Sequence, residues 1–222
     1  MHQIYEHDCY IFDCDGVILN SNILKVDAMR NTLSELAFSI SEVDLCVEYF
    51  SKNFGKSRFH HVEHFLEHIL TIKKQNKKQI QENILNSFSS QCKSLYLTAE
   101  LTPFFIEFIS SLKGVKYVAS GSEQNELRGV FEARELSQYF EDIYGSPTKK
   151  TELVEQILKQ NPSKKAIMFG DAVSDFEASR DNNINFICYL PYSNVKEKML
   201  ELSQTNDFQV ITEWPHEVTD NI

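Results

Sequence analysis

Residues 10–18 read Tyr-Ile-Phe-Asp-Cys-Asp-Gly-Val-Ile, an apolar run that ends in two carboxylates and a glycine. A short apolar run of this kind predicts a buried strand. Side chains two residues apart in a strand point to the same side, so Asp13 and Asp15 are expected to project together from its carboxyl end. Buried carboxylates are costly unless they are paired, hydrogen-bonded or bound to a metal. An ordinary polar turn would also contain Asp and Gly, so the rest of the chain decides between these interpretations.

The chain after this strand divides into two patterns. Between about residues 20 and 95, apolar residues recur at helical spacing, which predicts several amphipathic helices. From about residue 100, helical segments alternate with short apolar runs at 115–119, 143–144, 166–169 and 185–189. This alternation predicts βαβ units and a parallel sheet. We therefore expect an α/β fold with a doubly wound parallel sheet, formed by residues 1–18 and 97–222, and a helical domain of residues 19–96 inserted after the first strand.

The composition is that of an acidic globular chain. The formal net charge of −10 argues against non-specific binding to nucleic acid or to anionic membranes. The five cysteines are odd in number and lack CxxC spacing, which is typical of reduced thiols in a cytosolic protein. Neither a signal-peptide pattern nor an apolar run long enough for a membrane span is visible. We expect a cytoplasmic protein with no nucleic-acid or membrane partner, and its oligomeric state stays open.

Polar groups follow four of the predicted strands. In a parallel α/β sheet the carboxyl ends of the strands share one edge, and ligands bind there. The groups expected to meet at this edge are Asp13, Asp15, Ser120, Gly121, Lys149 or Lys150, Asp171 and Asp175. Carboxylates this close together cannot all stay ionised without compensation. A hard divalent cation such as Mg²⁺ would supply that compensation and recruit a phosphate as a further ligand.

These four motifs together resemble those of the haloacid dehalogenase-like superfamily. They occur in the family's order: Asp-Cys-Asp-Gly-Val at 13–17, Ala-Ser-Gly at 119–121, a lysine, and Gly-Asp at 170–171 with Asp175. The place of the insertion resembles the helical cap of the branch that contains phosphoglycolate phosphatase and β-phosphoglucomutase. The resemblance implies a Rossmann-like core under a cap domain. It also implies phosphoryl transfer, because true dehalogenases lack the second acid of the first motif.

The resemblance implies roles for the acidic residues. Asp13 would attack phosphorus, and Asp15 would serve as general acid and then as general base. Mg²⁺ would be held by the Asp13 carboxylate, the backbone carbonyl of Asp15 and Asp171, with Asp175 supporting or sharing the metal.

The phosphate ligands and the lysine follow from the same resemblance. Ser120 and the Gly121 amide would bind phosphoryl oxygens, and a lysine would neutralise charge in the transition state. Many relatives carry this lysine directly before the proline, where this chain has Ser146. The arrangement resembles the variant Gly-Ser-Pro-x-x-Lys, which favours Lys150. Lys149 stays an alternative, because one residue of register changes which side chain faces the site.

One segment of the insertion carries two candidate substrate contacts. Residues 53–58 read Asn-Phe-Gly-Lys-Ser-Arg, and capped relatives have a similar Gly-x-Ser-Arg segment that closes over the active site. Lys56 and Arg58 are therefore candidate contacts to a hydroxylated or anionic substrate. Two solvated charges at a helix start are an equally weighted interpretation.

The sequence thus predicts a Mg²⁺-dependent phosphatase that hydrolyses a small phosphorylated metabolite through an aspartyl-phosphate intermediate. A sugar or polyol phosphate is the expected substrate class. One alternative is a phosphomutase of the β-phosphoglucomutase type, which uses the same motifs. The other is a catalytically silent binding protein on the same fold, against which the intact pair of Asp13 and Asp15 argues.

Overall fold

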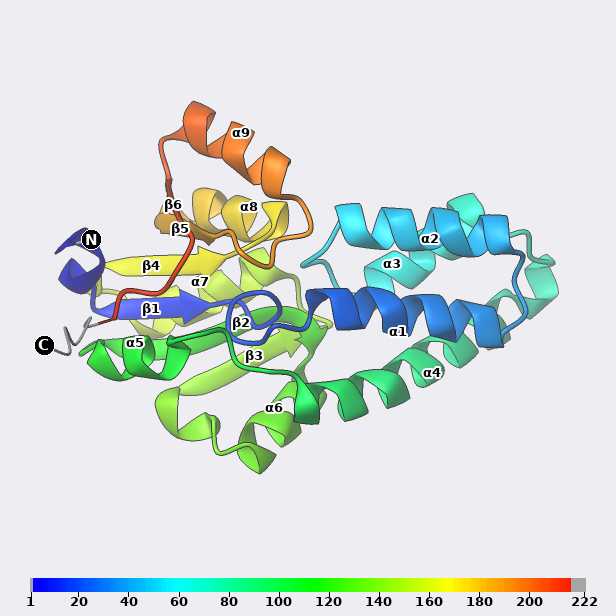
Figure 1. Cartoon of the computed structure of the whole chain (residues 1–222), viewed down its shortest axis with the longest axis horizontal. Coiled ribbons are helices and arrows are strands. Elements are labelled where there is room, and N and C mark those ends of the chain that lie inside the picture. The colour runs from blue at the N-terminus through cyan, green and yellow to red at the C-terminus, as the bar shows by residue number, and fades with distance from the viewer. Residues whose placement is uncertain (1, 217–222) are drawn as a thin grey trace, which may run out of the picture.

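A six-stranded parallel sheet lies at the centre of the computed structural model, which describes residues 2–216 except for the side chains of residues 2, 3 and 74 (Figure 1). The strand order is β3-β2-β1-β4-β5-β6, so the direction of winding reverses beside β1. Such a reversal opens a crevice at the carboxyl ends of the strands. The strands are β1 (Cys9–Phe12), β2 (Val115–Glu123), β3 (Asp142–Ser146), β4 (Ala166–Gly170), β5 (Asn185–Tyr189) and β6 (Gln209–Ile211).

Helices cover both faces of this sheet, and β1 supplies alternate side chains to each face. Tyr10 and Phe12 belong to the core under α5 and α6, whereas Cys9 and Ile11 belong to the core under α7, α8 and α9. This alternation is the period of two expected of a strand buried on both sides. The covering helices are α5 (Phe105–Ser111), α6 (Gln124–Ala133), α7 (Lys150–Gln160), α8 (Val173–Asp181) and α9 (Lys196–Asn206).

The segment between β1 and α5 forms a helical layer beyond the carboxyl ends of the strands, on the right in Figure 1. We call residues 22–98 the helical insertion. Its apolar side chains, among them Met29, Phe50 and Phe88, are continuous with the core under α5 and α6. It consists of α1 (Asn22–Glu35), α2 (Ile40–Lys52), α3 (Arg58–His64), the π-helical turn η2 (Phe65–Ile69), the 3₁₀ turn η3 (Lys74–Asn76) and α4 (Lys77–Thr98).

The carboxyl-terminal segment contains α9 and then β6. Trp214 and Pro215 follow β6 in irregular structure. Trp214 is fully buried, and its Nε1 donates a hydrogen bond to Thr102 Oγ1 at 2.9 Å. Its ring stacks on Tyr189 with centroids 4.3 Å apart. Tertiary packing of the indole therefore decides the course of this segment.

No helix within residues 2–216 combines the length and the apolar character that a membrane span requires.

Candidate active site

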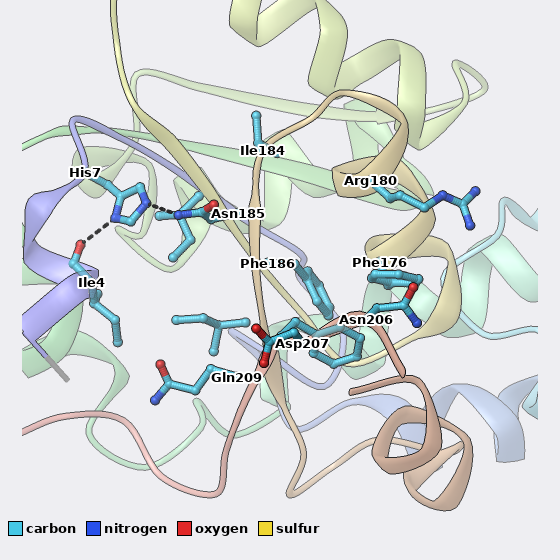
Figure 2. Close-up of a pocket in the computed structure, with 13 residues that line it drawn as sticks. Ile4, His7, Phe176, Arg180, Ile184, Asn185, Phe186, Asn206, Asp207 and Gln209 are labelled. Atoms are coloured by element: carbon cyan, nitrogen blue, oxygen red, sulfur yellow. Dashed lines mark hydrogen bonds between the residues drawn. The ribbon is translucent and has the colours of Figure 1, made fainter. Parts of the chain in front are cut away.

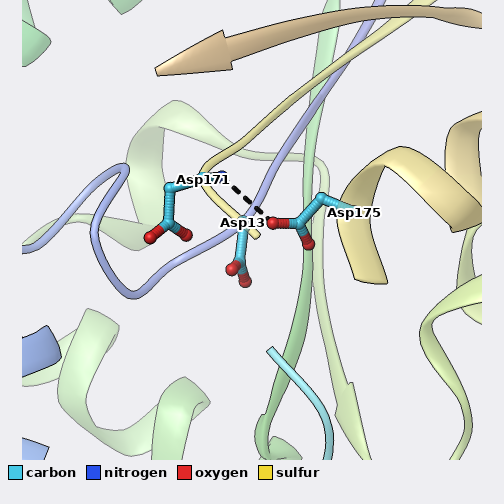
Figure 3. Close-up of side chains that lie close together, drawn as sticks. All are labelled: Asp13, Asp171 and Asp175. Atoms are coloured by element: carbon cyan, nitrogen blue, oxygen red, sulfur yellow. Dashed lines mark hydrogen bonds between the residues drawn. The ribbon is translucent and has the colours of Figure 1, made fainter. Parts of the chain in front are cut away.

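Three aspartates that follow β1 and β4 meet at the carboxyl edge of the sheet (Figure 3). One carboxylate oxygen of each of Asp13, Asp171 and Asp175 lies within 4.8 Å of the other two, and all three side chains are buried. Asp175 lies in the first turn of α8, where its Oδ2 accepts hydrogen bonds from the backbone N–H groups of Asp171 (3.0 Å) and Ala172 (2.9 Å). The strand-end geometry predicted from the sequence therefore brings these carboxylates together.

The electrostatics of this cluster suit a divalent cation. Burial, together with the nearby carboxylates, raises the pKa of Asp13 to about 7 despite the opposing effect of Lys150. Burial and the charge of Asp175 likewise raise the pKa of Asp171 well above its usual range. The buried Asp171 Oδ1 has no hydrogen-bond partner in the described part of the chain. Clustered carboxylate oxygens with an unused acceptor are the donor set that Mg²⁺ takes in proteins, so these residues fit the implied metal.

Lys150 is the lysine that lies against this cluster. Its Nζ is 3.1 Å from Asp13 Oδ1 and also bonds Asp175 Oδ1. The neighbouring Lys149 is the N-cap of α7 and is exposed. Of the two lysines that the sequence left open, Lys150 is thus the one in contact with the carboxylates.

Asp15 occupies a separate buried network. Its carboxylate accepts hydrogen bonds from Lys25 Nζ (2.9 Å), Ser21 Oγ (2.6 Å), Ser122 Oγ (2.9 Å) and Tyr96 OH (2.9 and 3.0 Å). Burial alone would raise the pKa of Asp15, but the Lys25 charge and these hydrogen bonds hold it below its ordinary value. Asp15 is therefore an ionised, fully engaged carboxylate in this conformation.

Lys25 was not among the residues predicted for the site, although the helical pattern of the sequence indicates that it is buried. The helical spacing from Lys25 to Met29 and Thr32 places all three on the buried face of α1. Ile23, an apolar residue of the same helix, is in contrast 70% exposed. A cation on the buried face of a helix requires a buried anion, and Asp15 is that anion.

Asn22 is a second residue that sequence reasoning missed. Its Nδ2 donates to Asp171 Oδ2 at 2.7 Å and to the Tyr192 carbonyl at 2.8 Å, which links α1 to the carboxylate cluster. Gly16 makes this approach possible, because a Cβ there would lie 2.5 Å from Asn22 Nδ2 and 2.6 Å from Asp171 Oδ2. Its φ of +74° also favours glycine. The first motif therefore needs glycine after its second aspartate.

The predicted phosphate ligands lie where the helical insertion meets the sheet. Ser120 is buried, and its Oγ accepts a hydrogen bond from the Ser122 N–H at 3.2 Å. The backbone at Gly121 touches that at Gly55, since a Cβ on Gly121 would lie 2.3 Å from the Gly55 carbonyl oxygen. The insertion therefore closes directly onto the predicted phosphate loop.

A narrow space, with room for about one water molecule, lies beneath this contact, and we call it the chamber. The aspartates of the first motif and Ser120 line one side of it, and the helical insertion lines the other. Its lining residues are Asp13, Asp15, Lys25, Phe50, Phe54, Gly55, Lys56, His61, Ser120 and Gly121. A wider outer cleft, lined by Lys56, His60, Lys149 and Lys150 among others, adjoins the chamber at Gly55 and Gly121. Residues predicted from the first two motifs and from the cap segment thus line the chamber, whereas Lys150 lines the adjoining outer cleft.

The two candidate cap contacts, Lys56 and Arg58, lie in different surroundings. Lys56 is exposed and lines both the chamber and the outer cleft. Arg58 is buried, and its Nη1 and Nη2 donate to the two carboxylate oxygens of Glu126 at 2.9 and 2.6 Å. Its guanidinium also lies 5.2 Å from the Phe88 ring centroid. Arg58 therefore joins α3 to α6 and does not line the chamber.

A further cavity lies away from the aspartates, beside β5, β6 and α8 (Figure 2). The rings of Phe176, Phe186 and Phe208 line it, and His7 on its rim contacts the Ile4 carbonyl at 3.2 Å and Asn185 Nδ2 at 2.9 Å. None of the residues predicted for the site belongs to it. This cavity therefore lies apart from the predicted active site, whereas the larger outer cleft adjoins it.

Similar folds occur among solved structures. A predicted phosphatase from Clostridium acetobutylicum matches with a TM-score of 0.72 and 16% identity, over 93% of this chain and 94% of that chain. A predicted phosphoglycolate phosphatase from Haemophilus somnus matches with a TM-score of 0.73 and 13% identity, over 94% and 95%. A mutant of CbbY from Rhodobacter sphaeroides in complex with xylulose-1,5-bisphosphate matches with a TM-score of 0.72 and 14% identity, also over 94% and 95%. At these identities the likeness shows the fold.

Comparison with curated protein sequences gives no match. The family model for haloacid dehalogenase-like hydrolases, in contrast, matches residues 10–189. That range contains all four motifs and the whole helical insertion. The chain therefore belongs to the haloacid dehalogenase-like hydrolase family.

Proposed function

We propose that this protein is a Mg²⁺-dependent phosphatase that acts on a small phosphorylated metabolite, with sugar and polyol phosphates as the first candidates. The observation that carries the proposal is the buried cluster of Asp13, Asp171 and Asp175 with Lys150 against it. The helical insertion would act as the cap over residues 1–18 and 97–222. The similar structures described as phosphatases, and the one with a bound sugar bisphosphate, support this reaction class.

Asp13 is the proposed nucleophile. Its Oδ1 accepts a hydrogen bond from the Cys14 N–H at 2.7 Å and contacts Lys150, while no described residue bonds its Oδ2. Oδ2 would form the bond to phosphorus as the ester oxygen leaves, which gives an aspartyl phosphate and the free alcohol. Asp13, Asp171, the Asp15 carbonyl and Asp175 would hold Mg²⁺. The bound ion would neutralise charge on the phosphoryl group.

Lys150, Ser120 and Gly121 would complete the phosphoryl site. The Lys150 ammonium would share its charge between Asp13 and the transferring group, which stabilises the transition state. The Ser120 hydroxyl and the Gly121 N–H would donate to phosphoryl oxygens. Gly121 lies at the closed contact with the insertion, which would exclude water while the phosphoryl group transfers.

Asp15 is the proposed acid and base. Its ionised state suits the second half of the reaction, in which it would take a proton from the water that attacks the aspartyl phosphate. In the first half it would first have to take up a proton from solvent, which it would then give to the leaving alcohol. Arrival of the substrate would therefore have to loosen the contact of Asp15 with Lys25.

A phosphomutase is the second candidate, and the closed contact between Gly55 and Gly121 is the observation that favours it. A mutase must keep water from the aspartyl phosphate and return the phosphoryl group to the substrate. A requirement for a bisphosphate primer would distinguish it from a phosphatase. Phosphate release from unrelated monoesters without a primer would favour hydrolysis.

The test is release of inorganic phosphate from a panel of phosphorylated metabolites, with Mg²⁺ and with a chelator. Asp13→Asn should reduce release to background, whereas Asp181→Asn, on the exposed face of α8, should not change it. Asp15→Asn should slow turnover while largely retaining Mg²⁺ affinity, because only its carbonyl would bind the metal. Equal turnover in Asp13→Asn and the unmodified protein would contradict the mechanism.

A further inference from the structure

His61 is a buried histidine of the helical insertion whose side chain has no hydrogen-bond partner among the described residues. It lies in α3, is 1% exposed, and neither Nδ1 nor Nε2 is bonded to any group within the described residues. The great majority of buried polar side chains in proteins do have such partners. A buried group without one therefore needs an explanation, and a missing ligand is one of the physical possibilities.

The position of His61 indicates where such a ligand would lie. His61 lines the chamber together with Asp13 and Ser120. Around it the wall is aromatic, with the Phe50 ring centroid at 4.6 Å and the Phe65 centroid at 6.3 Å. A substrate with its phosphoryl group at Asp13 would extend its alcohol part toward this wall, once the insertion has opened and closed again over it.

His61 is suited to a neutral hydrogen-bonding group. Burial and the nearby cationic side chains, including Lys25 and Lys56, keep the pKa of His61 well below its ordinary value, so the ring is neutral. A neutral imidazole offers one N–H donor and one nitrogen acceptor. A hydroxyl group can both donate and accept, so it matches this ring.

The cations around the chamber indicate, in addition, which charge the alcohol part of the substrate would carry. Lys25 is paired with Asp15, and Arg58 is paired with Glu126 outside the chamber. Lys56 is exposed and donates to Asn53 Oδ1 at 3.4 Å. Among the described residues, the buried cations of the insertion, Lys25 and Arg58, are thus already neutralised. A second anionic group on the alcohol part would be desolvated there without a buried partner.

We propose that His61 binds a hydroxyl group on the alcohol part of the substrate, and that this selects small, uncharged, hydroxylated phosphate monoesters. Esters with a purely apolar alcohol part, or with a second anionic group, would bind more weakly. The proposal rests on the proposed phosphatase function, since it takes Asp13 as the phosphoryl site.

Binding can be measured without turnover in the Asp13→Asn protein with Mg²⁺ present. Calorimetry would compare glycerol 1-phosphate with propyl phosphate, which has the same carbon chain and no hydroxyl groups. Leaving one buried hydrogen-bonding group unpaired predicts about 5- to 150-fold weaker binding of propyl phosphate. 2-Phosphoglycolate, with its carboxylate, should also bind more weakly than glycerol 1-phosphate.

Variants at His61 separate recognition from folding. His61→Phe, in the same Asp13→Asn background, keeps an aromatic ring among Phe50 and Phe65, and the preference for glycerol 1-phosphate should fall to about 2-fold or less. His61→Gln retains a donor and an acceptor, so it should keep part of the preference. The matched control is His64→Phe in the next turn of α3, which stacks on Tyr49 outside the chamber and should leave the preference unchanged.

Three results would overturn the proposal: equal or undetectable binding of both neutral esters, tighter binding of 2-phosphoglycolate, or an unchanged preference in His61→Phe. Failure of the phosphatase function is distinguishable from these. It would appear as no phosphate release from any compound by the unmodified protein, while the binding preference could still be measured and still depend on His61.

Discussion

Replacing Lys25 by methionine is expected to lower the free energy of unfolding by about 3 kcal/mol. The Lys25 and Asp15 side chains are 9% and 5% exposed, and Lys25 Nζ lies 2.9 Å from Asp15 Oδ2. Removing one partner of a buried ion pair costs about 3–5 kcal/mol, because the other charge stays buried. The hydroxyl groups of Ser21, Tyr96 and Ser122 would still bond Asp15, which places the expected loss at the lower end.

The pH dependence of this loss has a definite sign. The pKa of Asp15 in the folded protein lies below its unfolded value of about 3.9. The ionised Asp15 therefore stabilises the fold fully above about pH 3.9. This stabilisation is lost as the pH falls through the pKa of the folded protein. In Lys25→Met the largest opposing charge is gone, so burial raises the pKa of Asp15. The difference in stability between the two proteins should therefore be largest above the raised pKa of Asp15 in Lys25→Met, and should shrink as the pH falls from that pKa toward the lowered pKa of Asp15 in the unmodified protein.

The assay is urea unfolding, followed by the fluorescence of the single, buried Trp214 and by circular dichroism. At about 2–4 °C per kcal/mol for a chain of this size, the loss corresponds to a melting temperature about 6–12 °C lower. The matched control is Lys52→Met, whose ion pair with Glu48 is 69% and 58% exposed and should contribute about 0–1 kcal/mol. If Lys25→Met loses no more than this control, the buried pair does not hold the fold together and the reasoning is refuted.

Three further outcomes are expected. Arg58→Met should cost about 3–5 kcal/mol of stability in the same urea assay, because it leaves the Glu126 carboxylate buried and unpaired. Gly121→Ala should cut phosphate release strongly with little loss of stability, since its Cβ would meet the Gly55 carbonyl at 2.3 Å and hold the insertion open. The pKa of Asp13 is raised to about 7 in the folded protein, so folding favours the protonated carboxyl group. Without metal, the melting temperature should therefore fall as the pH rises from about 4 to 7. Added Mg²⁺ should reverse that fall.

The lysine of the third motif illustrates the limit of a sequence argument. Both Lys149 and Lys150 follow Pro147 at the start of a helix, and local spacing did not separate them. In the structure α7 begins at Lys150, which is buried against Asp13, whereas Lys149 is its exposed N-cap. The start of α7, fixed by packing against β2 and α8, decides which ammonium reaches the carboxylates.

Arg58 illustrates the same limit in the insertion. Its place in a Gly-x-Ser-Arg segment suggested a substrate contact, but its guanidinium is bonded to Glu126 on α6. The two residues are 68 positions apart, so no local pattern links them. Their pairing depends on how α3 packs over the core.

The sequence by itself determined the parallel α/β sheet, its inserted helices and the meeting of Asp13, Asp171 and Asp175 at one edge. These follow from local rules, namely the period of strands and helices and the common direction of parallel strands. Only the tertiary structure decided that Lys25 pairs with Asp15 and that His61 lines the chamber without a hydrogen-bond partner among the described residues. Those contacts join the insertion to the core, and their geometry depends on the packing of segments far apart in the chain.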